Sequence, residues 1–263
     1  MTKFFMGFFA LVLFAACNNA GKEETTAKMV ASDLALEGLK GDISAIEESP
    51  YKTDSTGKPG DMDSCCISVW EYDNNGNNTK WTSKDSKGTV KETAENTRYP
   101  NGMWKGNVNT KNGKTSGSFE TGIDDKGIYI SAVAKDSAGK LDVYYTNISQ
   151  NENGQVLTWK QYDKDSVYRQ EGESKYDKNL QTSFMMKDSV GKLKSSSAYK
   201  YNDKGQQVEV SNTNVTKDSS TTTVTKYTYD TNDEMGNWTQ RTAWNDKGKA
   251  TAVARRNYTY RKK

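Results

Sequence analysis

The chain of 263 residues has no histidine, only three prolines and only three cysteines. Without histidine it cannot build Ser-His-Asp or Cys-His catalytic pairs, or the usual zinc sites. It also lacks an excess of charge of one sign: 37 basic and 34 acidic residues leave a formal net charge of +3. Acidic loops of calcium-binding type are absent too. We therefore expect no nucleic-acid partner, no metal and no cofactor.

A long hydrophobic run is missing as well. The apolar stretch at residues 4–14 is shorter than the roughly 20 residues that span a bilayer, and it follows Lys3 as the core of a signal peptide does. Small residues then precede Cys17, which resembles the lipobox of bacterial lipoproteins, although Phe14 stands where that motif usually has leucine.

The lipobox resemblance implies that residues 1–16 are removed and that Cys17 carries an acyl chain such as palmitate. The protein would then be lipid-anchored to the outer membrane, on its periplasmic or its cell-surface face. An ordinary secretory signal with an incidental cysteine is the alternative.

Residues 17–35 have little to bury and are predicted to form a flexible tether with a short helical turn. Ser32 is a candidate N-cap for that turn, and Gly38 ends it. The charged residues 22–24 resemble export signals of Bacteroidota-type lipoproteins, or are simply charges in a linker.

Turn signals recur along the rest of the chain. Hydrophobic residues make up 33% of the sequence, yet aromatic residues reach 11%. A D-x-x-G tetrad or a near variant occurs every 12 residues or so, and Asp, Asn and Gly favour hairpin turns. The tetrads begin at Asp73, Asp85, Asp124, Asp136, Asn151, Asp188, Asn202 and Asn245.

Aromatic residues two positions apart precede several turns, as in Trp70 with Tyr72 and Tyr227 with Tyr229. A period of two places both rings on one face of a sheet. They are predicted to form a ladder that is either the core of a thin sheet or a surface for stacking carbohydrate. The candidate binding surface comprises Trp70, Tyr72, Trp81, Trp159, Trp238 and Trp244.

Residues 36–263 are therefore predicted to be an all-β domain, an antiparallel meander of repeated β-hairpins. We expect one continuous extended sheet, twisted and with room to curl, whose exposed face is rich in Lys, Thr, Ser and Asn. Such a sheet would offer a broad surface and no deep pocket.

A family resemblance supports the hairpins. Residues 226–260 carry Y-x-Y-D, G-N-W-x-x-R and R-x-Y in succession, and residues 72–81 are a partial copy. This pattern resembles YD-type repeats of RHS-like proteins and of Bacteroidota lipoproteins, while residues 98–108 resemble MORN-type hairpins. The resemblance implies stacked hairpins and a role outside the cytoplasm, with no shared catalytic residues.

Few residues offer chemistry. Cys65 and Cys66 are adjacent, which is closer than disulfides usually allow, so two packed thiols are favoured over a vicinal disulfide. Two carboxylate pairs could serve a glycosidase, although most acidic residues lie in turns. The pairs are Asp124 with Asp125 and Glu171 with Glu173.

Asp-Ser followed by a small or aliphatic residue resembles the O-glycosylation sequon of Bacteroidota envelope proteins, and turn chemistry explains the same dipeptide equally well. The serines are Ser55, Ser137, Ser166 and Ser189.

The sequence favours a non-catalytic binding or scaffold lipoprotein whose partner is a glycan or an envelope protein. The alternatives are an immunity-type lipoprotein that neutralises a protein partner and a glycan-active hydrolase.

Overall fold

Tight turns divide residues 43–260 into antiparallel strands in the computed structural model, which describes residues 30–262. The 17 strands belong to one sheet, as predicted. They are β1 (Ile43–Thr53), β2 (Pro59–Met62), β3 (Ile67–Tyr72), β4 (Asn78–Lys84), β5 (Val90–Arg98), β6 (Trp104–Lys111), β7 (Lys114–Ile123), β8 (Tyr129–Asp136), β9 (Leu141–Gln150), β10 (Val156–Asp163), β11 (Tyr168–Asp177), β12 (Leu180–Asp188), β13 (Leu193–Tyr201), β14 (Gln207–Val215), β15 (Ser220–Asn232), β16 (Trp238–Asn245) and β17 (Ala250–Tyr260).

The tetrads form the predicted hairpin turns. In the turn at residues 73–76, the Gly76 amide donates to the Asp73 carbonyl at 3.0 Å, and the Asp73 amide donates to the Asn77 carbonyl at 2.9 Å. The Asp73 carboxylate accepts the amides of Asn75 and Asn77 at 2.9 and 2.8 Å. Gly76 has φ +81°, which glycine adopts without strain. The same backbone bond from fourth to first residue closes turns 54–57, 73–76, 85–88, 99–102, 124–127, 136–139, 151–154, 163–166, 188–191, 202–205, 233–236 and 245–248.

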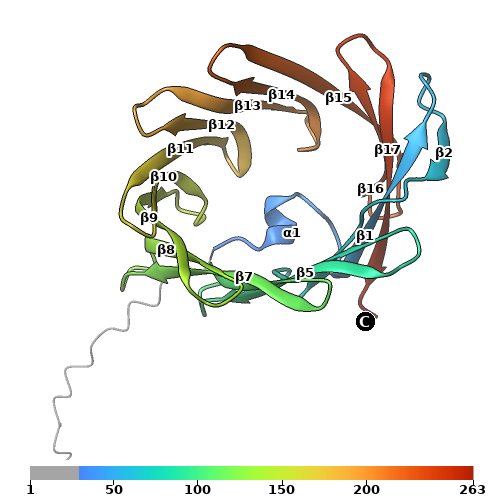
Figure 1. Cartoon of the computed structure of the whole chain (residues 1–263). Helices are drawn as coiled ribbons and strands as arrows, with labels where there is room; N and C mark the ends of the chain where they lie inside the picture. Colours follow the sequence, from blue (N-terminus) through green and yellow to red (C-terminus); the bar gives the residue numbers. More distant parts are fainter. Residues whose placement is uncertain (1–29, 263) are drawn as a thin grey trace, which may run out of the picture.

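The sheet closes on itself, so the prediction of an open extended sheet is wrong. One edge of β1 pairs with β17, from Ile43 opposite Tyr260 to Tyr51 opposite Val253. Its other edge pairs with β3 and, further along, with β2. Because β2 and β3 share one position beside β1, the 17 strands form a barrel with 16 positions. Figure 1 shows the strands as a ring seen along its axis.

The barrel has two distinct ends, because successive hairpin turns alternate between them. We call the end with turns 73–76, 99–102, 124–127, 151–154, 202–205 and 233–236 the plug end, and the end with turns 54–57, 85–88, 136–139, 163–166, 188–191 and 245–248 the far end. The described chain starts and finishes at the plug end: the Val30 amide donates to the Asn101 carbonyl, and Tyr260 lies beside Asp233.

A short helix, α1 (Asp33–Leu36), lies inside the ring (Figure 1). The predicted N-cap is confirmed, since the Ser32 hydroxyl accepts the Ala35 amide at 3.4 Å. The helix partly closes the plug end: the Leu34 amide donates to the Gly76 carbonyl, and the Lys40 amide donates to the Asn237 side chain. The part of the predicted tether from residue 30 onward is therefore packed into the barrel.

Beneath α1, a small hydrophobic core joins the helix to the seam of the barrel. Ile43 and Ile46 of β1 are 0% and 1% exposed and cluster with Leu34 and Tyr72. Ile46 lies opposite Tyr258 on one neighbouring strand and opposite Trp70 on the other. Apolar packing is therefore concentrated where the first strand of the barrel meets the last.

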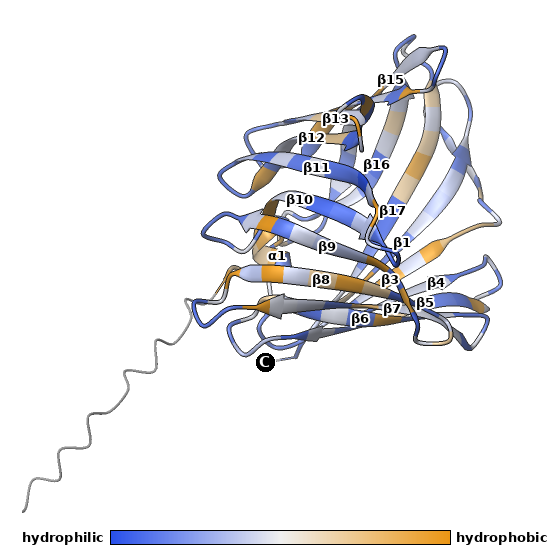
Figure 2. Cartoon of the chain, turned by 60° about the vertical axis from the view of Figure 1, so that its left-hand side comes forward, coloured by the Kyte–Doolittle hydropathy of each residue, from blue (hydrophilic) through white to orange (hydrophobic). Residues whose placement is uncertain are grey.

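Polar and apolar residues alternate along many strands (Figure 2), and polar side chains lie on the outer face, as predicted for the exposed face of the sheet. Cross-strand ion pairs lie on this face: Lys135 with Glu120 at 2.9 Å and Lys200 with Glu209 at 2.8 Å. Threonine pairs such as Thr213 with the Thr222 across from it bond through their hydroxyls at 2.9 Å.

Candidate functional site

The barrel encloses a lumen, which the predicted open sheet would not have. Three open cavities lie along the lumen, two of them beside α1. One, of about 680 Å³, lies between residues 36–40 and strands β12 to β17. A second, of about 470 Å³, lies between α1 and strands β3 to β8. A third, of about 490 Å³, has a mostly apolar wall.

The wall of the third cavity is a row of aromatic rings on neighbouring strands. Trp104 and Phe119 stack with ring centroids 5.1 Å apart, Phe119 lies 5.6 Å from Tyr145, and Tyr145 lies 5.5 Å from Trp159. Tyr129, only 6% exposed, completes the wall and donates its hydroxyl to the Trp104 carbonyl. Aromatic contacts of this kind stabilise a wall without filling the space it surrounds.

Five of the six residues predicted as an aromatic surface face the lumen, and Trp244 does not. Trp81 lies opposite Trp70, which itself lies opposite the buried Ile46, so these rings point inward. Trp244 lies outside, where its indole nitrogen donates to Thr228 at 3.0 Å and its ring lies under Gly57. The lumenal five are Trp70, Tyr72, Trp81, Trp159 and Trp238.

Two arginines and one carboxylate form a charged cluster on the lumenal wall. Arg256 donates from Nε to Glu48 at 2.7 Å, and Arg241 Nη2 lies 3.5 Å from the same carboxylate. Both guanidinium groups lie over the ring of Trp238, at 4.2 and 4.8 Å from its centroid. Cation–π contact and a shared carboxylate fix both cations in place.

Burial raises the pKa of the phenol of Tyr258, and Arg256 works in the opposite direction. The Glu37 side chain is open to the lumen, yet the protein around it raises the pKa of its carboxyl by desolvation, against the lowering effect of Arg256. Glu37 and Arg256 both line the cavity of about 680 Å³ beside α1.

Asp33 anchors α1 to the wall. Its carboxylate accepts the Asn78 amide at 2.6 Å and a bond from Arg98 Nη2. Arg98 also donates from Nη1 to the Gly102 carbonyl at 2.8 Å. The helix is therefore held by a charge-assisted contact as well as by Leu34.

Sequence reasoning missed the lumenal arginines as site residues, although a signal for them was present. The repeat pattern in residues 226–260 places Arg241 three residues after Trp238, and Arg256 two residues before Tyr258. The same pattern gives no hint of their partner Glu48, which is 208 residues from Arg256 in sequence.

The nominated carboxylate pairs do not face the lumen. Asp124 accepts the amides of Lys126 and Ile128 and so has a structural role in its turn. Its neighbour Asp125 lies in the same exposed turn. Glu171 and Glu173 lie on the outer face beside Lys160 and Lys175, at 4.0 and 3.7 Å.

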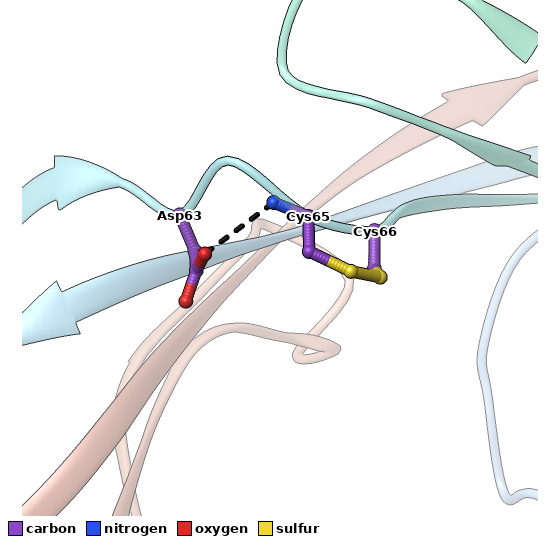
Figure 3. The surroundings of a disulfide bond; sticks show 3 residues. All are labelled: Asp63, Cys65 and Cys66. Atoms are coloured by element: carbon purple, nitrogen blue, oxygen red, sulfur yellow. Dashed lines mark hydrogen bonds between the residues drawn. A yellow bond between two sulfur atoms is a disulfide. The ribbon is translucent and has the colours of Figure 1, made fainter.

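Cys65 and Cys66 form a vicinal disulfide, so the expectation of two packed thiols is wrong (Figure 3). Their Cα atoms are 3.7 Å apart, both residues are exposed, and the Cys65 amide donates to Asp63. They lie between β2 and β3, where no strand pairs with β1, and Cys66 has φ +77°. The backbone is therefore not extended there, and the two side chains can point in the same direction.

The serines of the predicted sequon share one location. All four are exposed and lie in far-end turns, at residues 55, 137, 166 and 189.

Cys17 and the predicted signal peptide lie outside the described residues. Within residues 30–262, no group of acidic and cysteine side chains is placed to hold a metal ion. No helix in that part of the chain is long and apolar enough to cross a membrane.

Comparison with known proteins shows a likeness in fold. No family model and no curated protein matches the sequence. A porin-like protein from Bacteroides uniformis is similar with a TM-score of 0.51 at 13% identity, over 82% of this chain and 98% of that one. Weaker similarities are to the Photorhabdus luminescens Tc holotoxin pore (TM-score 0.29, 13% identity, 72% of this chain and 12% of that one) and to a LolA superfamily protein from Nitrosomonas europaea (TM-score 0.27, 8% identity, 88% and 92%).

Proposed function

We propose that the protein is a non-catalytic binding module of the cell envelope that takes a small ligand into its lumen. The observation that carries this proposal is the inward-facing aromatic wall around open cavities of about 470 to 680 Å³. Ligand sites are typically concave, of about 300 to 1,000 Å³, and lined by aromatic side chains with a few polar groups.

The outer face supports a location beside a membrane rather than within it. A barrel that spans lipid presents an apolar band to the acyl chains. Here that face carries ion pairs such as Lys80 with Glu95, and Lys135 with Glu120. We infer that the acyl chain on Cys17 is the anchor and that the barrel stays in water.

The anchor also sets the orientation that we propose. The chain enters the barrel at the plug end, and the 13 residues from 17 to 29 reach at most about 45 Å when extended. The plug end would then face the membrane and the far end would face away. O-glycans on Ser55, Ser137, Ser166 and Ser189 would surround the far end, and an intact mass of peptide plus lipid alone would rule them out.

The six tryptophans provide the test, because five face the lumen and Trp244 faces outward. Indole ¹H–¹⁵N NMR signals would be assigned by single Trp→Phe variants and followed during titration with anilinonaphthalene sulfonate and with neutral disaccharides. A lumenal ligand should shift the signals of Trp104 and Trp159 and leave Trp244 unchanged. Shifts confined to Trp244, or no shift with any probe, would contradict binding in the lumen.

A further inference from the structure

The charged cluster on the lumenal wall carries more positive than negative charge. Arg241 and Arg256 share the single carboxylate of Glu48, with side-chain exposures of 25%, 14% and 19% respectively. Arg256 holds the closer contact, at 2.7 Å against 3.5 Å for Arg241. One carboxylate neutralises one guanidinium, so the second positive charge has no matching acid within the cluster.

Arg241 is the more open of the two cations. Its guanidinium lies over the rings of Tyr227 and Trp238, 4.8 Å from each centroid. Ring stacking uses the face of a guanidinium and leaves the N–H groups in its plane able to bind an anion, often with two parallel bonds. Arg241 also lines the cavity of about 680 Å³, so a ligand in that cavity can reach its guanidinium.

The other charged groups around that cavity leave the balance positive. Lys40 and Lys204 line it together with the two arginines, against the acids Glu37 and Asp203. With Glu48, which lies beside the two arginines, the cavity has four positively charged side chains and three negatively charged ones. A ligand with one negative charge would complete the balance.

The remaining lining suits a sugar ring. Tyr201 and Tyr229 donate their hydroxyls to the carbonyls of Gln181 and Gln207, both at 2.8 Å, which fixes the two rings as stacking surfaces. Side-chain amides add donors and acceptors that match hydroxyl groups, and three of them are held in place by protein partners, because Asn179 accepts from Asn153, Gln181 donates to Ser174 and Gln206 accepts from Asn202. These amides belong to Asn179, Gln181, Gln206, Gln207 and Asn232.

Resting on the proposed lumenal function, we propose that this cavity binds an acidic sugar of the uronate class. Its carboxylate is held by Arg241, with Arg256 behind it, and its ring lies against Tyr201 and Tyr229. The volume of about 680 Å³ accommodates a mono- or disaccharide.

Isothermal titration of the full barrel with galacturonic acid, its α-1,4-linked dimer, galactose and acetate tests the proposal. Galactose differs from galacturonic acid only in having a hydroxymethyl group in place of the carboxylate. We expect the uronates to bind at least tenfold more tightly than galactose and acetate, and to shift the Trp238 indole signal. Arg241→Gln should weaken uronate binding by about 10- to 100-fold, as expected for loss of a charged hydrogen bond. Arg255→Gln is the matched control, because Arg255 is on β17 but faces outward over Tyr51.

Several results would overturn the proposal. Equal affinity for galactose would remove the role of the arginines, and equal affinity for acetate would show an anion site without sugar recognition. Unchanged binding in a folded Arg241→Gln variant, or no binding of any of these sugars, would also refute it. Lumenal indole shifts with anilinonaphthalene sulfonate would still support a binding lumen in those cases, so the two proposals fail separately.

Discussion

Closure of the barrel can be tested at Ile46, which is 1% exposed at the seam between β17 and β3. Ile46→Ala removes three carbons from a site enclosed by Tyr258, Trp70 and Leu34, and cannot collapse because strands flank it on both sides. A fully buried isoleucine replaced by alanine lowers the free energy of unfolding by about 2 to 5 kcal/mol. For a chain of this size, that corresponds to a fall of about 4 to 20 °C in Tm.

The assay is urea and thermal unfolding followed by circular dichroism, with Ile130→Ala as the control. Ile130 is also a strand isoleucine, but it is 57% exposed, so its loss should change the stability by no more than about 0.5 kcal/mol. If β1 were the free edge of an open sheet, Ile46 would lack one neighbouring strand. Equal and small losses for the two variants would refute closure at this seam.

Three further outcomes are expected. Burial raises the pKa of Tyr129 and of Tyr260 to about 12, above about 10 in the unfolded chain, so their contribution to stability is complete below pH 10 and is lost between pH 10 and 12. The check is an absorbance titration of the folded barrel beside its Tyr129→Phe and Tyr260→Phe variants, and a variant that lacks part of the wild-type tyrosinate signal already at pH 10 would contradict this. Cys17→Ala should abolish labelling with palmitate, and a variant that stays labelled would place the anchor elsewhere. Asp33→Asn should lower the free energy of unfolding by about 1.5 to 3 kcal/mol by weakening the contact with Arg98, and unchanged urea unfolding would argue against that anchor.

The turns could be predicted because their cause is local. An aspartate or asparagine that binds amides two and four residues ahead, followed by a glycine at positive φ, specifies its own hairpin. Even Asp163 forms this turn without glycine, since Ser166 adopts φ +63° there. The turns reverse the chain, so they also predict antiparallel strands. The alternation of side chains along a strand then puts Trp70 and Tyr72 on the same face.

Closure could not be predicted in the same way. The pairing of β1 with β17 joins residues more than 200 positions apart, such as Glu48 and Arg256, and has no local signature. Trp244 follows Trp238 by six residues, so an unbroken period of two predicts the same face for both, but a register shift in the β15–β16 pairing between Trp238 and Gln240 turns Trp244 outward. Neither closure nor this shift can be read from the alternation of residue types.

The width of the barrel links its sequence to its proposed function. About eight strands make a barrel that side chains alone can fill, whereas about 16 leave a wider interior. Residues 30–262 provide 16 strand positions and one helix of four residues inside them, so the aromatic faces that would form the core of a thin sheet instead surround open space. The rings meet one another along the wall, as Trp104, Phe119 and Tyr145 do, but not across it. An interior that is too wide to pack and too aromatic to resemble a plain water channel is the physical setting in which a small ligand gains by binding.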